Sequence, residues 1–455
     1  MSITNFFTAI MLSSNRDTRA DNVSLGMPAD IMSLNGLKYR IPQPISSGVS
    51  RSYKKEYAQK SSYIQNQVMV FDWNTGTTYV NPDTAKLSFE YNHVLGAIAA
   101  GGNGKFVFCG SLGAASLIAE IRVISKNGIE LDRISDAAVL SKIFVDYATT
   151  SEQRGELEMA SGFGKSASNF LLNLAGANKI VDGDRTLLQT LKVVIPLKYL
   201  SGFFRPVIRD MLIPAGLASG LRIEFSLISD ITHGVQTNGS VPISFTVSNP
   251  VILLETTEMN DPTQSALMKE SAANGLEYTF PSYYSTKLSV GINGTLATQV
   301  NKAVSQATRL FLILQNDFIA PEGEVLVDSL ASVDISDYTR YHFRVGQSYF
   351  PYLAVDVSSE KMGYALSTFS GWKDFNTGTS VDYDGYSTGG KAVVGTSLET
   401  TDRLNLSGLM LNNSSTGEVR FTVGDLGGRA GLRGVFFLEF VAVVKTSLNK
   451  SSLRI

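Results

Sequence analysis

The chain has 455 residues, of which 44% are hydrophobic and 18% are charged, and its formal net charge at pH 7 is −2. This balance argues against nucleic-acid binding over the whole chain, and a single cysteine, Cys109, excludes intramolecular disulfides and multi-cysteine zinc sites. The few charges, together with 40 glycines, 24 phenylalanines and 18 tyrosines, favour β-sheets with many turns and much surface buried against other chains.

The first 65 residues are predicted to form an extended arm, because prolines and glycines interrupt every long element. Eight basic and four acidic residues make this arm net positive. Its last part alternates aromatic and basic side chains: Arg51, Tyr53, Lys54, Lys55, Tyr57, Lys60 and Tyr63. We interpret the arm as a solvated or subunit-clamping tail, with contact to nucleic acid or anionic lipid as the alternative. The apolar patch within residues 6–12 lacks a preceding basic residue, so it reads poorly as a secretory signal.

Strands are predicted from residue 68 onward, and Asn81-Pro82-Asp83 is predicted to be a turn between two of them. Hydrophobic residues at alternating positions then mark half-buried strands over 117–123 and 221–227. Between these two strands, Lys126-Asn127-Gly128 predicts a turn. The further strands of the first half are expected at 68–71, 76–80, 87–91, 106–109, 187–197, 241–247 and 251–255.

A short helix is predicted to begin at Ser135 or Asp136, since either side chain can cap it. Its apolar face would hold Val139, Leu140, Ile143 and Phe144. The later Gly162-Phe163-Gly164-Lys165-Ser166 does not satisfy the phosphate-loop spacing, because the first glycine would fall at Met159. We therefore interpret residues 162–166 as a loop.

The second half repeats the pattern of alternating strands after a polar connection at residues 257–275. A helix is expected over Val357–Phe369, with Met362, Ala365, Leu366 and Phe369 at helical spacing. The Gly- and Ser-rich residues 371–390 are predicted to form an exposed loop. Strands are expected at 276–280, 288–292, 310–314, 419–423 and 435–444.

Several segments, in this order, resemble the double jelly-roll major capsid proteins of small eukaryotic DNA viruses related to polintons, polinton-like viruses and virophages. The resemblance covers roughly residues 68–450 and leaves the arm outside. Its carriers are Thr78–Pro82 with Leu87–Phe89; Ser125, Gly128, Leu131 and Ile134; Asp146-Tyr147; Ser151–Arg154; Ser219–Phe225; and Tyr341–Pro351 with Gly346, Tyr349 and Pro351.

The resemblance implies an all-β chain of two tandem eight-stranded jelly rolls with short helices in the loops. The expected organisation is an N-terminal arm at 1–65, a first jelly roll at 66–256, a linker at 257–275 and a second jelly roll at 276–455. It further implies a non-enzymatic protein of the virion that forms a pseudo-hexameric homotrimer and tiles an icosahedral shell. Neighbouring trimers, penton and minor capsid proteins would be its partners, and the arm would contact an inner membrane or the genome.

No catalytic, cofactor-binding or metal-binding residue is predicted, and no small-molecule substrate is expected. Asp334 and Asp337 beside Tyr338 are interpreted as capping residues, and Glu322 with Glu324 is too small a set for calcium. The three histidines, His93, His233 and His342, are too widely spaced to suggest a metal motif. A β-sandwich that binds carbohydrate or a receptor remains the alternative, although only Trp73 and Trp372 could supply tryptophan platforms. A β-sandwich hydrolase is less favoured, since no acid/base pair stands out.

Overall fold

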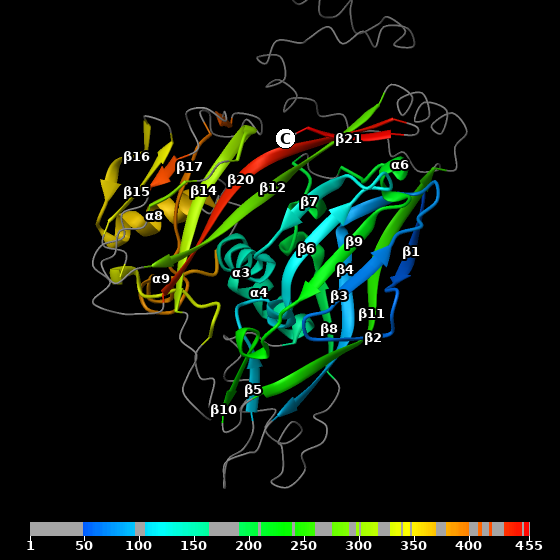
Figure 1. Ribbon diagram of the computed structural model, residues 1–455, viewed down its shortest axis with the longest axis horizontal. Coiled ribbons are helices and arrows are strands. Elements are labelled where there is room, and N and C mark those ends of the chain that lie inside the picture. Colours follow the sequence, from blue (N-terminus) through cyan, green and yellow to red (C-terminus); the bar gives the residue numbers. More distant parts are fainter. Residues whose placement is uncertain are drawn as a thin grey trace, which may run out of the picture. The chain divides into compact units, whose positions relative to one another are not determined.

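The computed structural model describes most of the chain from residue 49 onward as one compact unit. The described residues are 49–95, 105–162, 191–207, 211–238, 242–259, 275–290, 297–299, 302–316, 328–337, 340–345, 348–369, 379–399, 408–411, 418–420, 432–447 and 450–454. Figure 1 shows a first group of sheets, coloured blue to green, beside a second group, coloured green to red.

The first jelly roll is built from two antiparallel sheets. The larger one has the order β1 (Val49–Tyr57), β11 (Pro242–Met259), β4 (Tyr79–Leu95) and β8 (Leu191–Pro196), and β2 (Ser62–Ile64) also pairs with β11. The second has the order β3 (Val68–Asp72), β9 (Arg222–Leu227), β6 (Ile118–Ile124) and β7 (Glu130–Ile134). A separate pair joins β5 (Lys105–Phe108) to β10 (Val235–Asn238). Alternate residues of the strands, such as Phe89, Ile223 and Phe225, are buried in the common core.

The large sheet of the second jelly roll repeats the strand order of the first roll's large sheet. Its large sheet runs β12 (Leu276–Val290), β20 (Leu432–Ser447), β14 (Val304–Asn316) and β17 (Val394–Ser397), with β18 (Leu409–Leu411) on β14 and β21 (Lys450–Arg454) on β20. Smaller pairs are β13 (Ala297–Gln299) with β19 (Glu418–Arg420), and β15 (Tyr341–Val345) with β16 (Ser348–Val355). In each roll, therefore, the first strand of the large sheet pairs with a long late strand, and that strand pairs with an early one. This shared order agrees with the double jelly-roll topology that the family resemblance implied.

Short helices lie in the connections between strands. They are α3 (Ala137–Ala148), α4 (Ser151–Ser161), α6 (Ala215–Ala218), α8 (Ser358–Thr368) and α9 (Tyr383–Ser387), with 3-10 turns η2 (Gly113–Leu117), η5 (Leu197–Tyr199), η6 (Gly202–Phe204), η7 (Ile231–His233) and η8 (Ile335–Asp337). The predicted helix over 357–369 is confirmed as α8, which buries Ala365 and Leu366. Thr150 begins α4 with a capping box to Gln153, and Gly162 ends it in the left-handed conformation.

Some local predictions need correction. The predicted turn at Asn81-Pro82-Asp83 lies inside β4, where three extra residues form a bulge opposite β11: Lys86 pairs with Leu253, but Asn81 pairs with Glu255. The Asn81 side chain still makes a turn-like bond, because its Oδ1 accepts from the Asp83 N–H at 3.2 Å. The sequence prediction also omitted β7, which follows the correctly predicted turn at Gly128, a residue with φ of +78°.

The N-terminal boundary also differs from the expectation. Residues 49–64 were assigned to the arm, but β1 and β2 pair with β11 in the first large sheet. Tyr63 was expected in an exposed aromatic-basic run, yet it is buried, and its hydroxyl accepts from the Lys60 N–H at 3.0 Å. The backbone hydrogen bonds offered by the edge of β11 explain why this polar segment becomes a strand. At the other end of the first roll, residues 257–259, expected in the linker, continue β11.

The two rolls meet where η6 of the first approaches β12 of the second. Phe203 of η6 packs against Tyr278 and Phe280 with ring centroids 5.3 and 5.2 Å apart, and the Tyr278 hydroxyl donates to the Phe203 carbonyl at 2.6 Å. A Cβ atom on Gly202 would overlap the carbonyl oxygen of Pro281. Only glycine allows this close backbone approach.

We expect Gly202→Ala to lower the free energy of unfolding by about 1–3 kcal/mol, because the added methyl group forces β12 away from η6. The matched control is Gly216→Ala in α6, where a Cβ would meet no atom within 4 Å. That change should leave stability unaltered or raise it by less than about 1 kcal/mol. Urea denaturation of both variants measures the difference, and equal stabilities would contradict the close approach.

Candidate interaction surfaces and the junction between the jelly rolls

A buried ionic cluster on α3 and α4 lies at the junction of the two rolls. The Asp146 carboxylate is held by Lys142 Nζ at 2.9 Å and by an Arg154 guanidinium nitrogen at 3.4 Å, and it accepts from Ser111 Oγ at 2.7 Å. Arg154 also pairs with Glu158 at 3.0 Å. Burial by itself would raise the pKa of Asp146, but the charges of Lys142 and Arg154 outweigh it and hold the pKa below its usual range. The carboxylate is therefore ionised and paired.

The same cluster binds the second roll directly. Lys142 Nζ donates to the Gly390 carbonyl at 2.9 Å, and the Ser380 N–H and hydroxyl donate to the Asp146 carbonyl at 3.1 and 2.9 Å. The Tyr147 hydroxyl donates to the Lys391 carbonyl at 2.7 Å. Residues 379–390, predicted to be an exposed loop, thus pack against α3 in part, and Tyr386 is fully buried. The prediction was wrong for this part because the sequence does not reveal the polar partners that α3 supplies.

Helix α3 itself departs from the prediction of one apolar face. All its residues from Ala137 to Tyr147 are buried, including the charged ones. Asp136 stands at its N-terminus as predicted, but its carboxylate makes no capping bond. Instead it accepts from Ser285 Oγ at 2.8 Å and pairs with Lys287 Nζ at 3.0 Å, both on β12. Packing of the second roll over the helix explains why both faces are covered.

Asp132 of β7 makes a second buried polar contact across the junction. Its carboxylate accepts from Ser201 Oγ at 2.5 Å and from Ser282 Oγ of β12 at 2.7 Å. Burial raises the pKa of Asp132, since no cation offsets the loss of water as it does at Asp146, and hydrogen bonds oppose this only in part. The two buried carboxylates are thus shifted in opposite directions by their surroundings.

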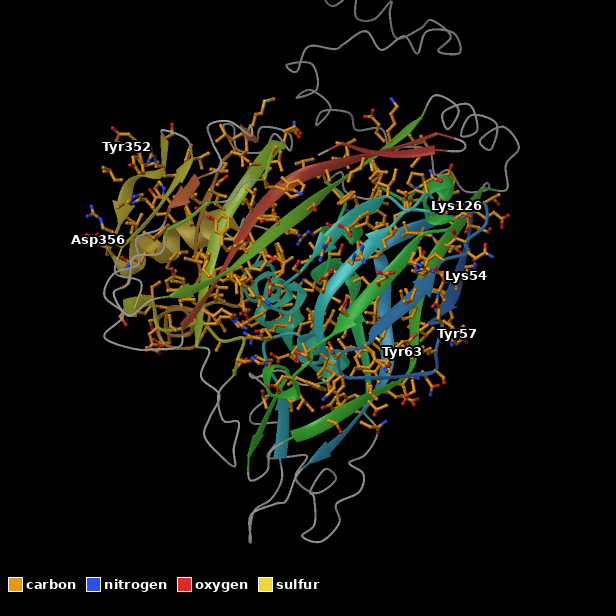
Figure 2. All side chains as sticks on the ribbon, viewed as in Figure 1. Lys54, Tyr57, Tyr63, Lys126, Tyr352 and Asp356 are labelled. Atoms are coloured by element: carbon orange, nitrogen blue, oxygen red, sulfur yellow. The ribbon has the colours of Figure 1, made fainter. Side chains whose placement is uncertain are left out.

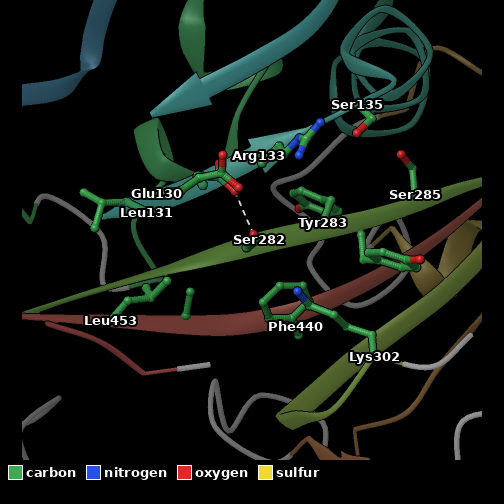
Figure 3. Close-up of a pocket in the computed structure, with 13 residues that line it drawn as sticks. Glu130, Leu131, Arg133, Ser135, Ser282, Tyr283, Ser285, Lys302, Phe440 and Leu453 are labelled. Atoms are coloured by element: carbon green, nitrogen blue, oxygen red, sulfur yellow. Dashed lines mark hydrogen bonds between the residues drawn. The ribbon is translucent and has the colours of Figure 1, made fainter. Parts of the chain in front are cut away.

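A cleft of about 270 Å³ opens beside Asp132, between β7 and the strands β12, β20 and β21 (Figure 3). Lys302 lies over the rings of Tyr284 and Phe440, with Nζ 5.8 and 6.0 Å from their centroids. The carboxylates of the cleft have structural partners: Glu130 pairs with Arg122 at 2.8 Å, and Asp132 bonds the two serines. The cleft therefore belongs to the junction and does not present a free acid/base pair.

The residues singled out in the sequence lie apart. Cys109 is buried, and burial raises the pKa of its thiol, with a smaller contribution from Asp328.

The two described histidine side chains also lie in separate places. His233 lies 3.8 Å from the Asp230 carboxylate, and His342 packs edge-on to Tyr349. Burial, followed by the charge of Arg340, lowers the pKa of His342. Trp73 is buried in the core. Asp334 precedes η8, in which Asp337 is the last residue.

The predictions for residues 163–166, Glu322, Glu324, Tyr338 and Trp372 concern positions outside the described residues, as do those for residues 1–48. Within the described ranges, no group of three or more His, Cys, Asp or Glu side chains is arranged to hold a metal ion. No helix of that part of the chain is both long and apolar enough to cross a membrane.

Exposed large apolar side chains gather at two places. The first is the outer face of β1, where alternate residues Arg51, Tyr53, Lys55 and Tyr57 project together. Tyr53 is 87% exposed and Tyr57 is 71% exposed. We call these four residues the basic-aromatic strip. Within the described chain, β1 pairs only with β11, so the strip follows an open sheet edge.

The second place is a projection of β16. Tyr341 pairs with Val355 and Phe343 with Phe350, so residues 351–354 bulge away from β15. Tyr352 on this bulge is 86% exposed and Leu353 is 75% exposed, and exposed Asp356 and Val357 follow them. We call Tyr352, Leu353, Asp356 and Val357 the β16 knob. Its large exposed apolar side chains indicate a contact surface.

The chain has a double jelly-roll fold, and solved structures of similar fold include viral major capsid proteins. VP54 of PBCV-1, in the crystal structure fitted into a reconstruction of the virophage Sputnik, matches with a TM-score of 0.60 at 9% identity, over 92% of this chain and 99% of that one. The Faustovirus major capsid protein matches with a TM-score of 0.58 at 8% identity, over 98% of both chains. A chain of the Sputnik virophage structure matches with a TM-score of 0.57 at 10% identity, over 91% and 90%. No family model and no curated sequence matches.

We expect Asp146→Asn to lower the free energy of unfolding at pH 7 by about 3 kcal/mol, because it removes the carboxylate that pairs with buried Lys142 and one of the two that pair with Arg154. The folded-state pKa of Asp146 lies below its unfolded value near 3.9. The stability that it contributes is thus present above that value and is lost as the pH falls through the folded pKa. The Asp146→Asn variant should therefore lack this part of the decrease in the free energy of unfolding at low pH.

Urea titrations of wild type and variant at pH 7 and at several values below 4 would measure both effects. Asp83→Asn is the matched control, because Asp83 is exposed and lies 4.0 Å from Lys198. Its loss should change stability by less than about 1 kcal/mol. A variant at position 146 that keeps the wild-type stability would show that the cluster does not hold the junction.

Proposed function

We propose that this chain is the structural major capsid protein of an icosahedral DNA virus and that it associates as a homotrimer of pseudo-hexagonal outline. The observation that supports this most is the repeated strand order of two jelly rolls within one chain. Two similar rolls in each of three subunits give six similar wedges around a threefold axis, which suits a lattice of six-neighbour contacts. The match to major capsid proteins over nearly the whole chain supports the same reading.

The junction between the two rolls gives a physical reason for the same proposal. A lattice block must keep its two rolls at a fixed angle, because rotation between them would break the sixfold outline. The Asp146 cluster, the Asp132 bonds and the close approach at Gly202 all oppose such rotation. Buried polar groups of this kind favour one arrangement, since any other leaves them unpaired.

The remaining partners follow as part of this proposal. Other copies of the trimer, penton and minor capsid proteins would be its neighbours, and the virion its location. The part of the arm before β1 would contact the genome or an inner membrane. The role is structural rather than enzymatic, which agrees with the engagement of the described buried carboxylates in the junction.

We expect the purified chain to elute as a species of three times 49.2 kDa by size-exclusion chromatography with light scattering. Negative-stain electron microscopy should show blocks of pseudo-hexagonal outline that form sheets or closed particles on concentration. A monodisperse monomer at low micromolar concentration, with no assembly over a range of salt and pH, would contradict the proposal. It would favour a binding or adhesion module, which a carbohydrate pull-down would then test.

A further inference from the structure

The basic-aromatic strip and the β16 knob lie at opposite ends of the described unit. Figure 2 shows Lys54 and Tyr57 at one edge of the view and Tyr352 and Asp356 at the other. The strip belongs to the first jelly roll, and the knob belongs to the second. A single copy therefore cannot bring them together, but two copies can.

The two surfaces are complementary in chemistry. Two cations of the strip, Arg51 and Lys55, alternate with its two exposed tyrosines. The knob carries the carboxylate of Asp356 beside exposed Tyr352, Leu353 and Val357. Tyrosine is enriched in protein interfaces because its ring is apolar and its hydroxyl can bond at the rim. Contact between the two surfaces would bury these rings and pair opposite charges.

Nearby charges do not remove this complementarity. Arg51 pairs with Glu255 of its own chain at 3.5 Å but keeps 75% of its side chain exposed. Among the described residues, no ion pair of Lys55 or Asp356 is found within 4 Å. Buried Lys361 interacts with the charge of Asp356, but the Asp356 residue itself stays exposed.

We propose that the β16 knob of one copy docks on the basic-aromatic strip of the next copy, so that a head-to-tail contact joins the second jelly roll to the first roll of its neighbour. The contact is heterologous, because each copy offers a different surface to each neighbour, and such a contact closes into a ring when the rotation permits. This inference rests on the proposed self-association and assigns residues to it. The occupant of the strip is a second copy of this chain.

Crosslinking tests the pairing directly, because the one native cysteine is buried. The double variant Lys55→Cys/Asp356→Cys keeps the exposed rings of both surfaces and places one thiol on each. With a short bismaleimide, it should give covalent oligomers up to a closed ring on denaturing gels. Each single variant should stay uncrosslinked, since like positions do not meet in a heterologous contact.

The matched control is Lys126→Cys/Asp356→Cys, which moves one thiol to an exposed turn of the first roll that is not part of the strip. It should remain uncrosslinked. Equal crosslinking of the control, dimers from either single variant, or no crosslinking in the double variant would each overturn the proposal. If the wild-type protein is still a trimer in these cases, only the proposed contact is wrong and the proposed function is retained. If the wild-type protein is a monomer, the contact and the proposed function are both wrong.

Charge exchange gives an independent test. Lys55→Asp and Asp356→Lys should each weaken association about tenfold or more, because each places like charges across the contact. The two changes in one chain should restore association to within about threefold of wild type, which a purely structural role would not produce. Lys126→Asp is the control and should leave association unchanged. Failure of the double variant to recover would contradict the pairing.

The strip also has the composition of a surface for anionic lipid. Sedimentation with vesicles containing phosphatidylserine distinguishes that occupant. If Tyr53→Ser/Tyr57→Ser abolishes vesicle binding yet leaves the oligomer intact, the strip binds membrane and the proposal is overturned. If the same variant weakens the affinity of self-association about 100-fold or more, the strip binds a second copy.

Discussion

The structure depends on the pairing of the buried Asp146 carboxylate with Lys142 and Arg154. A lone charge at this position would be too costly to bury, but one acid between two bases, with Ser111 completing its hydrogen bonds, is stable in the interior. Lys142 and the Asp146 backbone carbonyl also bind Gly390 and Ser380 of the second roll. The cluster therefore joins the core of the first roll to the second, and it holds the relative position of two otherwise separate β-sandwiches.

A rigid junction matters because the function that we propose is mechanical. Each jelly roll buries its own core, but a shell subunit must also present its outer surfaces at fixed angles to its neighbours. Polar contacts are suited to this task, since a buried hydrogen bond tolerates much less displacement than an apolar contact does. The aromatic contacts of Phe203 with Tyr278 and Phe280 add the apolar part of the same junction.

The junction also fixes the two exposed surfaces relative to each other. The β16 knob and the basic-aromatic strip lie on different rolls, so the junction also fixes their separation and direction. A subunit with a flexible junction would present the knob over many angles, and a closed ring would lose entropy on forming. Stability within the chain and association between chains are thus linked through the same buried residues.

Much of the fold could be predicted from the sequence by itself. Alternating apolar residues from Leu221 to Leu227 and the turn at Gly128 determined strands and their connection, because these signals are local. Ordered motifs indicated two jelly rolls. The sequence could not show that Asn81-Pro82-Asp83 lies inside a strand or that β1 joins the first sheet, since both depend on the distant partner β11. It also could not show that Asp146 meets Ser380, or that the strip and the knob lie far apart. Those relations join residues far apart in the chain, and only tertiary packing brings them together or sets them apart.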